Sequence, residues 1–156
     1  MIKEQFFPTT VYGKDLQLDN QTLANHIINW SKQDQGVLKT NMNGWHSKTD
    51  MHLKPEYQEL VKQLYIMQEE IYQEEWLDRK PMLGNMWANI NYSGGYNRPH
   101  VHPNCLFSGV YYVKANKESG TLAINDPRPG IQTMMPTRKS GRPPKHLWRE
   151  AHLDPV

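Results

Sequence analysis

The sequence predicts one α+β domain, mainly β, in which helices come first along the chain and strands follow. A chain of 156 residues suffices for one ordinary hydrophobic core, and a second independent core is not expected at this size. Up to Pro81 the apolar residues recur at helical spacing, whereas after it short aromatic and β-branched runs alternate with Gly, Asn and Pro. The 5 Trp, 8 Tyr and 3 Phe argue against a disordered chain, although only 37% of the residues are hydrophobic.

The first eighty residues are predicted to form one strand and two helices. Residues 6–18 alternate loosely between apolar and polar side chains and predict a strand, with a turn at Gly13. A short helix over about 21–33 follows, capped by Asp19 or Asn20. Its apolar residues at helical spacing are Leu23, Ile27 and Trp30.

A turn-forming segment, residues 40–47, leads toward a second, longer helix whose first turn is marked by Pro55. The apolar stripe of this helix consists of Leu60, Leu64, Met67 and Ile71. Its acidic residues lie elsewhere on the helix, and we expect them to form a solvated face.

The region after Pro81 predicts strands at about 82–92, 98–102, 107–114 and 120–125. We expect the helices to pack outside an antiparallel sheet or barrel that these strands begin. Within a single domain, 1–156, we therefore distinguish a helical N-terminal part (1–80), the first barrel strands (81–126) and an extended segment rich in proline and basic residues (127–156).

Composition excludes several classes of protein. No run of apolar residues is long enough to span a membrane and no signal segment precedes the domain, so we expect a soluble, cytoplasmic protein. The single cysteine, Cys105, can form neither an intramolecular disulfide nor a thiolate cluster, so His, Asp or Glu must hold any metal. The net charge of +2 does not predict a nucleic-acid partner.

The pair His100 and His102 has the most informative spacing among the seven histidines. Side chains two residues apart on a strand project from the same face, so both imidazoles can reach one point. Neutral imidazole binds Fe, Zn, Ni or Cu, and two such rings supply two positions of a coordination sphere. The pair alone is a weak signal, and a third ligand must come from elsewhere.

Short motifs around this pair resemble a known family. They are Asn43-Gly44-Trp45-His46-Ser47, His100-Val101-His102-Pro103, Ser108-Gly109-Val110-Tyr111-Tyr112-Val113 and Asp126-Pro127-Arg128. In this order, the motifs resemble non-haem iron, 2-oxoglutarate (2OG)-dependent oxygenases, and specifically a prolyl-hydroxylase-like type found in bacteria and marine phages. The resemblance implies a double-stranded β-helix, a jelly-roll or cupin-like barrel, with Fe(II) and 2OG as cofactors.

The resemblance also implies roles for single residues. His100 takes the place of the family's first iron ligand, and His102 stands where a carboxylate is expected. Three interpretations stay open: a site with more imidazoles, a carboxylate supplied elsewhere with Asp126 as the nearest candidate, or a metal-binding relative without the oxygenase reaction.

Candidate cosubstrate residues follow from the same resemblance. Tyr112 matches the tyrosine that binds the distal carboxylate of 2OG, and Tyr92 resembles a second tyrosine facing the cosubstrate. Either phenol could equally be an ordinary barrel residue. The cation that pairs with 2OG could be Arg128, Arg138 or Arg142, and the distal ligand could be His146 or His152. Family members have further strands, so we expect the barrel to be incomplete in this chain.

The leading hypothesis is a dioxygenase that hydroxylates an unknown substrate, with a peptide side chain suggested by analogy. The alternative is a cupin-like metal-binding protein, although Leu106 and Phe107 stand where the cupin motif has glutamate. The expected partners are a small-molecule cosubstrate and an unidentified substrate, with neither a membrane nor nucleic acid. A homo-oligomer stays open.

Overall fold

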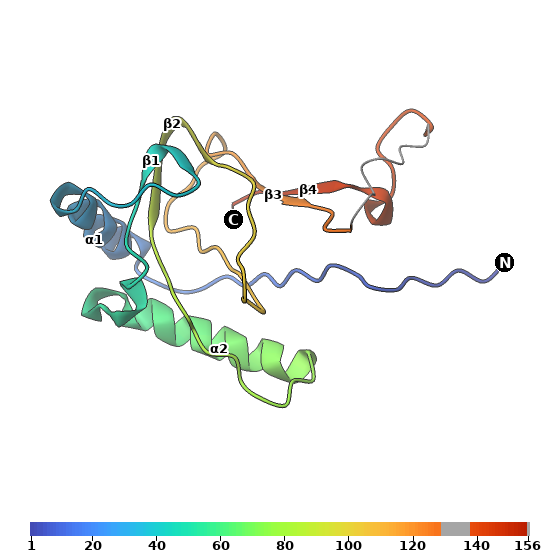
Figure 1. Cartoon of the computed structure of the whole chain (residues 1–156), viewed down its shortest axis with the longest axis horizontal. Helices are drawn as coiled ribbons and strands as arrows, with labels where there is room; N and C mark the ends of the chain where they lie inside the picture. Colours follow the sequence, from blue (N-terminus) through green and yellow to red (C-terminus); the bar gives the residue numbers. More distant parts are fainter. Residues whose placement is uncertain (129–137, 156) are drawn as a thin grey trace. The chain divides into compact units, whose positions relative to one another are not determined.

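The computed structural model describes residues 1–128 and 138–155 (Figure 1). The chain divides into two compact units, Met1–Val113 and Lys114–Val156. Part of the predicted extended segment, residues 129–137, and Val156 lie outside the described residues. The single domain with its three parts, 1–80, 81–126 and 127–156, stays a prediction.

Helix α1 (Asn20–Gln33) confirms the first predicted helix. Asp19 caps it, since its Oδ1 accepts the backbone N–H of Thr22 at 3.0 Å and its Oδ2 accepts the Thr22 hydroxyl at 2.6 Å. These hydrogen bonds lower the pKa of the Asp19 carboxyl. The helix buries Leu23, Ala24 and Ile27, so the predicted spacing does mark its packed face.

The second predicted helix is present as α2 (Gln58–Glu74). Two short 3₁₀ turns precede it, η1 (Met51–Leu53) and η2 (Pro55–Tyr57), and Pro55 opens the second of them. Of the predicted apolar stripe, Leu60 is buried, together with Val61 next to it.

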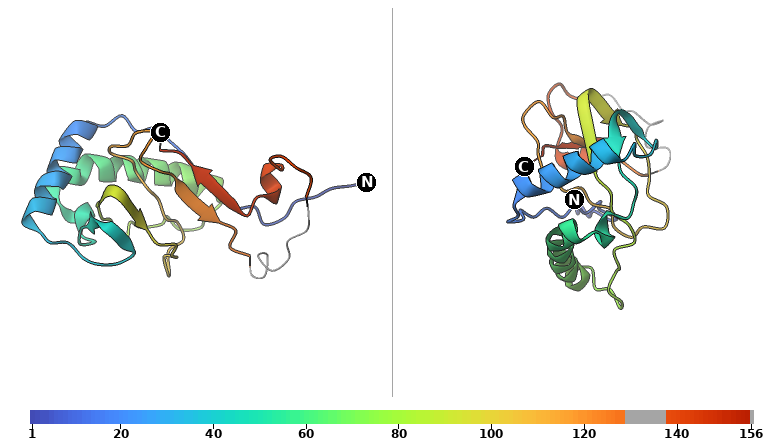
Figure 2. Two further views of the ribbon diagram at one scale, coloured as in Figure 1. Left: turned by 90° about the horizontal axis from the view of Figure 1, so that it is seen from above. Right: turned by 90° about the vertical axis from the view of Figure 1, so that its left-hand side faces the viewer.

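Strands β1 (Asn41–His46) and β2 (Asn89–Asn97) form an antiparallel sheet in the first unit (Figure 2). The turn predicted over 40–47 is therefore wrong. The turn-forming residues instead make a β-bulge between Met42 and Gly44, where Asn43 takes a φ of +51°. A Cβ on Gly44 would lie only 2.7 Å from the Ile90 carbonyl oxygen, so glycine permits this close pairing.

Three of the predicted strands are corrected. Residues 82–92 are strand only from Asn89, and residues 98–102 form none, because Pro99 lacks a backbone N–H for a ladder. Residues 107–114 form no strand either and pack through side chains, since the Tyr111 hydroxyl donates to Asn20 Oδ1 at 2.6 Å.

Residues 6–18 likewise form no strand. The side chains of this segment contact α2 instead of a neighbouring strand, since the Tyr12 hydroxyl donates to Glu75 Oε1 at 2.6 Å and Lys14 pairs with Glu70. Such isolated side-chain contacts can form without the backbone hydrogen bonds of a β-strand.

The core of the first unit joins α1, β1 and the 3₁₀ turns. It consists of Leu23, Ile27, Trp45, Met51, Tyr57 and Ala88. Trp45 is fixed at its polar end as well, since its Nε1–H donates to the Asp34 carbonyl at 2.8 Å. The end of β1 is thereby held rigidly against the core.

In the second unit, β3 (Leu122–Asn125) pairs antiparallel with β4 (Glu150–Leu153), and η4 (Lys145–Leu147) precedes β4. The strand predicted over 120–125 is confirmed. The described strands make two two-stranded sheets, so the double-stranded β-helix stays a prediction. Among the described residues, no helix combines the length and apolar character needed to cross a membrane.

Candidate metal centre

The two histidines of the His-x-His motif meet immediately after β2. The Nε2 atoms of His100 and His102 lie 3.0 Å apart, and the rings stack with centroids 5.0 Å apart. The pair does not lie on a strand, so the predicted juxtaposition is confirmed but its predicted cause is wrong. The backbone N–H of Arg98 donates to the Thr40 carbonyl at 2.9 Å, which anchors the start of this loop beside β1.

The hydrogen bond of His100 defines its tautomer. Its Nδ1 lies 2.7 Å from the Arg98 carbonyl oxygen, which can only accept, so Nδ1 carries the proton. In the neutral ring, Nε2 then carries the lone pair that a metal ion needs. Histidine ligands of metals are oriented in this way by carbonyl partners.

The spacing of the two nitrogens fits a shared metal ion. Two nitrogens that each lie about 2.1 Å from one metal, at a right angle to each other, are about 3.0 Å apart. The observed separation of His100 Nε2 and His102 Nε2 is 3.0 Å. Without a metal ion, a proton on His102 Nε2 can form a hydrogen bond to His100 Nε2 across the same distance. A metal ion can therefore bind both nitrogens only after His102 Nε2 has lost this proton.

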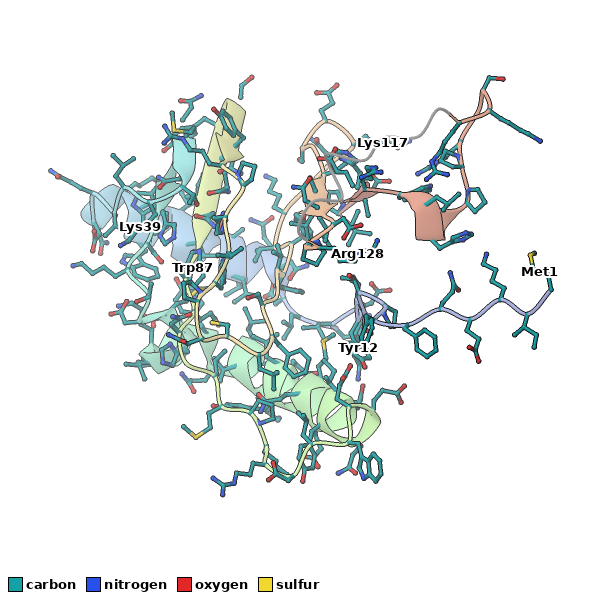
Figure 3. The ribbon with its side chains drawn as sticks, turned by 45° about the vertical axis from the view of Figure 1, so that its right-hand side comes forward. Met1, Tyr12, Lys39, Trp87, Lys117 and Arg128 are labelled. Atoms are coloured by element: carbon teal, nitrogen blue, oxygen red, sulfur yellow. The ribbon has the colours of Figure 1, made fainter. Side chains whose placement is uncertain are left out.

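Trp87 connects this pair to the core. Its ring centroid lies 5.3 Å from that of His102, and the ring stacks on that of His46 with centroids 5.4 Å apart and an interplanar angle of 12°. Trp87 is labelled in Figure 3. His46 is buried, and its Nδ1–H donates to the Ser47 carbonyl at 2.6 Å. A column of four rings, His46, Trp87, His102 and His100, therefore links the end of β1 to the candidate ligands.

Ser47 follows His46, at the β1 end of this column. It is fully buried, and its hydroxyl accepts the backbone N–H of Ala88 at 3.0 Å while donating to the Lys48 carbonyl at 2.7 Å. The backbone N–H of Ser47 donates in turn to the Ala88 carbonyl at 3.0 Å. These hydrogen bonds fix the residue that follows Trp87.

The sequence motifs alone do not indicate a role for Trp87, His46 or Ser47. A usable signal was present, since His46 and Ser47 end the motif Asn43-Gly44-Trp45-His46-Ser47 that contributed to the family resemblance. Without coordinates, nothing in the spacing connected that motif to a histidine pair more than fifty residues later.

The two predicted cosubstrate tyrosines lie in the same unit as the histidines. Tyr92 is 57% exposed on β2, whereas Tyr112 is half-buried and its burial raises the pKa of its hydroxyl. In the described residues, neither tyrosine takes part in the ring stacking or hydrogen bonds of the histidine pair.

Asp126 and Arg128 belong to the second unit and bind each other. The Arg128 Nε–H donates to Asp126 Oδ1 at 2.9 Å, its Nη2 pairs with Oδ2, and its backbone N–H also donates to Oδ1, at 3.1 Å. This bidentate pair lowers the pKa of Asp126 to about 2. Both carboxylate oxygens already accept hydrogen bonds from Arg128, so a metal ion at Asp126 would compete with this pair.

The remaining candidates for a third ligand also lie in the second unit. His152 on β4 makes a hydrogen bond between Nδ1 and Thr121 Oγ1 at 2.9 Å, and its Nε2 lies 3.6 Å from Glu150. His146 lies on η4. Across residues 1–128 and 138–155, no group of three or more His, Cys, Asp or Glu side chains is arranged to hold a metal ion. The described geometry therefore provides two ligands.

Comparison with known proteins bears on this site. Residues 85–153 match the model of a family described as "Putative 2OG-Fe(II) oxygenase". No curated protein and no solved structure matches the chain significantly. The matched segment contains both histidines of the pair, Trp87 and the predicted cosubstrate residues, and the family implies Fe(II) and 2OG as cofactors.

Proposed function

We propose that the protein is a dioxygenase that uses Fe(II) and 2OG to hydroxylate an organic substrate, because residues 85–153 match the model of a family described as "Putative 2OG-Fe(II) oxygenase". The observation that supports this most directly is the 3.0 Å separation of His100 Nε2 and His102 Nε2, which suits two adjacent ligands of one iron ion. Among substrates, a peptide side chain is the class that the family resemblance favours.

When bound, iron(II) and 2OG would supply the chemistry by which dioxygen oxidises a C–H bond, while 2OG is converted to succinate and carbon dioxide. The task of His100 is to present an unprotonated Nε2, which the hydrogen bond from Nδ1 to the Arg98 carbonyl secures. His102 adds the second nitrogen, and the Trp87 ring against it restricts the orientation of its imidazole.

Tyr112 is the stronger of the two candidates for cosubstrate binding. Its half-buried phenol has a raised pKa, so it stays protonated and can donate a hydrogen bond to a carboxylate. Tyr92 is more exposed and would bind its ligand in competition with water. Arg128 can pair with 2OG only by sharing its guanidinium with Asp126.

The residue at position 102 supports a second candidate function. An imidazole in place of the family's carboxylate makes the site one unit more positive, which changes both metal preference and redox behaviour. A metal-binding relative without oxygenase activity, cupin-like in its use of imidazole ligands, is therefore the alternative.

Succinate formation separates these two functions. The purified chain, supplied with iron(II), 2OG, ascorbate and oxygen, is expected to produce succinate even without its substrate, and His100→Ala should abolish this. His26→Ala serves as the matched control, since it removes an imidazole on α1 and should leave the rate unchanged. If the wild-type chain binds iron but only His102→Asp forms succinate, the alternative function holds and the oxygenase proposal fails.

A further inference from the structure

The second unit contains a pocket of about 420 Å³, whose lining includes three residues that the family resemblance offered as partners of 2OG or of the metal, Arg138, Arg142 and His152. Its polar lining comprises three arginines, Arg138, Arg142 and Arg149, together with Glu150 and His152. The other described residues of the lining are apolar or aromatic, among them Trp148. The pocket therefore combines a concentration of guanidinium groups with an aromatic wall.

Arg142 and Trp148 are fixed against each other. The guanidinium carbon of Arg142 lies 4.0 Å from the centroid of the Trp148 ring. The indole is itself anchored, since its Nε1–H donates to the Pro143 carbonyl at 2.7 Å and its backbone N–H to the Lys145 carbonyl at 3.0 Å. A guanidinium that lies on an aromatic face keeps its N–H donors at its edge, where they can reach an oxyanion.

The charge of the lining determines the class of ligand. Three arginines against one glutamate leave two positive charges in excess when His152 is neutral. Glu150 lies 3.6 Å from the His152 imidazole. Arg128, which pairs with Asp126, is not part of the lining. One carboxylate would be matched by one guanidinium, whereas several guanidiniums suit a group with more charge and more acceptor oxygens.

We propose that this pocket binds the phosphate group of an organic phosphate, with Arg142 on the Trp148 ring as its preorganised donor. The apolar part of the lining would accommodate the organic portion of the ligand. This inference does not depend on the histidine pair, because the residues of the pocket all lie within the second unit and neither His100 nor His102 is among them.

Calorimetric titration of the full chain with inorganic phosphate at constant ionic strength tests the proposal. Saturable one-site binding is expected, and Arg142→Gln should weaken it by about tenfold or more, since a charge-assisted hydrogen bond contributes about 1.5–3 kcal/mol. Lys117→Gln removes an exposed cation of the same unit outside the pocket and should change the affinity less than about twofold. Should Arg142→Gln fail to fold by circular dichroism, Arg138→Gln is expected to weaken binding in its place.

Two further titrations identify the source of the phosphate. Tighter binding of adenosine monophosphate than of inorganic phosphate supports a small organic phosphate, whereas tighter binding of a short oligothymidylate supports the phosphates of a nucleic acid. Equal weakening by Arg142→Gln and Lys117→Gln, or the absence of saturation, would overturn the proposal. Binding of succinate in preference to phosphate, lost in Arg142→Gln, would overturn it as well and assign the pocket to carboxylates.

Discussion

Replacing Ser47 by alanine should destabilise the first unit and loosen the ring column that ends at the histidine pair. The change removes the hydroxyl that accepts the Ala88 N–H at 3.0 Å, and Ala88 is itself buried at 5% exposure. An unsatisfied buried N–H costs about 1–3 kcal/mol, and the donor bond to the Lys48 carbonyl at 2.7 Å is lost as well. We therefore expect the free energy of unfolding to fall by about 2–3 kcal/mol.

Urea unfolding followed by tryptophan fluorescence measures this effect. With a slope of about 2 kcal/mol/M, the midpoint should move down by roughly 1 M or more. Ser31→Ala is the matched control, because the Ser31 hydroxyl donates to the Ile28 carbonyl within α1 at an exposed site and its loss should cost less than about 0.5 kcal/mol. A loss of stability in Ser47→Ala no larger than that in Ser31→Ala would show that Ser47 does not fix this end of the column.

Three other perturbations test the fold and its charges. Gly36→Ala should lower the free energy of unfolding by at least about 2 kcal/mol in the same urea assay. The φ of Gly36 is +73°, and a Cβ there would lie 2.4 Å from the His46 carbonyl oxygen. An unchanged urea midpoint would contradict this geometry. The pKa of Asp126 is lowered to about 2. The stabilisation from its pair with Arg128 should therefore be complete above about pH 4 and decline between pH 4 and pH 2. In acid unfolding, Asp126→Asn should lack that decline. Burial raises the pKa of Tyr57 to about 12. The folded state should therefore lose stability as the pH rises from 10 toward 12. In thermal melts, Tyr57→Phe should lose less stability over that range.

The helices could be predicted because their signals are local. Asp19 caps α1 through Thr22, three residues away, and the spacing of Leu23 and Ile27 marks the face that is buried. The strands could be predicted less well, because a ladder needs a partner that the local sequence does not contain. The segment 40–47 has turn-forming residues, yet it pairs with β2 once Asn43 and Gly44 form a bulge.

The candidate site shows the same division. The His100 and His102 pair could be predicted from its spacing of two, although a loop and not a strand brings the rings together. Trp87 and His46 could not, because their stacking depends on the pairing of β1 with β2. Asp126 illustrates a different limit, since the sequence cannot tell whether a carboxylate is available or already bound to a neighbour such as Arg128.

The proposed function requires His100 and His102 to hold an iron ion to which 2OG can bind. An anaerobic titration of the chain with iron(II) and then 2OG, followed by visible absorption, tests it most directly. We expect one iron ion per chain and a charge-transfer band when 2OG is added, with iron affinity reduced more than about a hundredfold in His100→Ala. Iron bound at full stoichiometry by His100→Ala, or bound iron that gives no band with 2OG, would exclude this iron site.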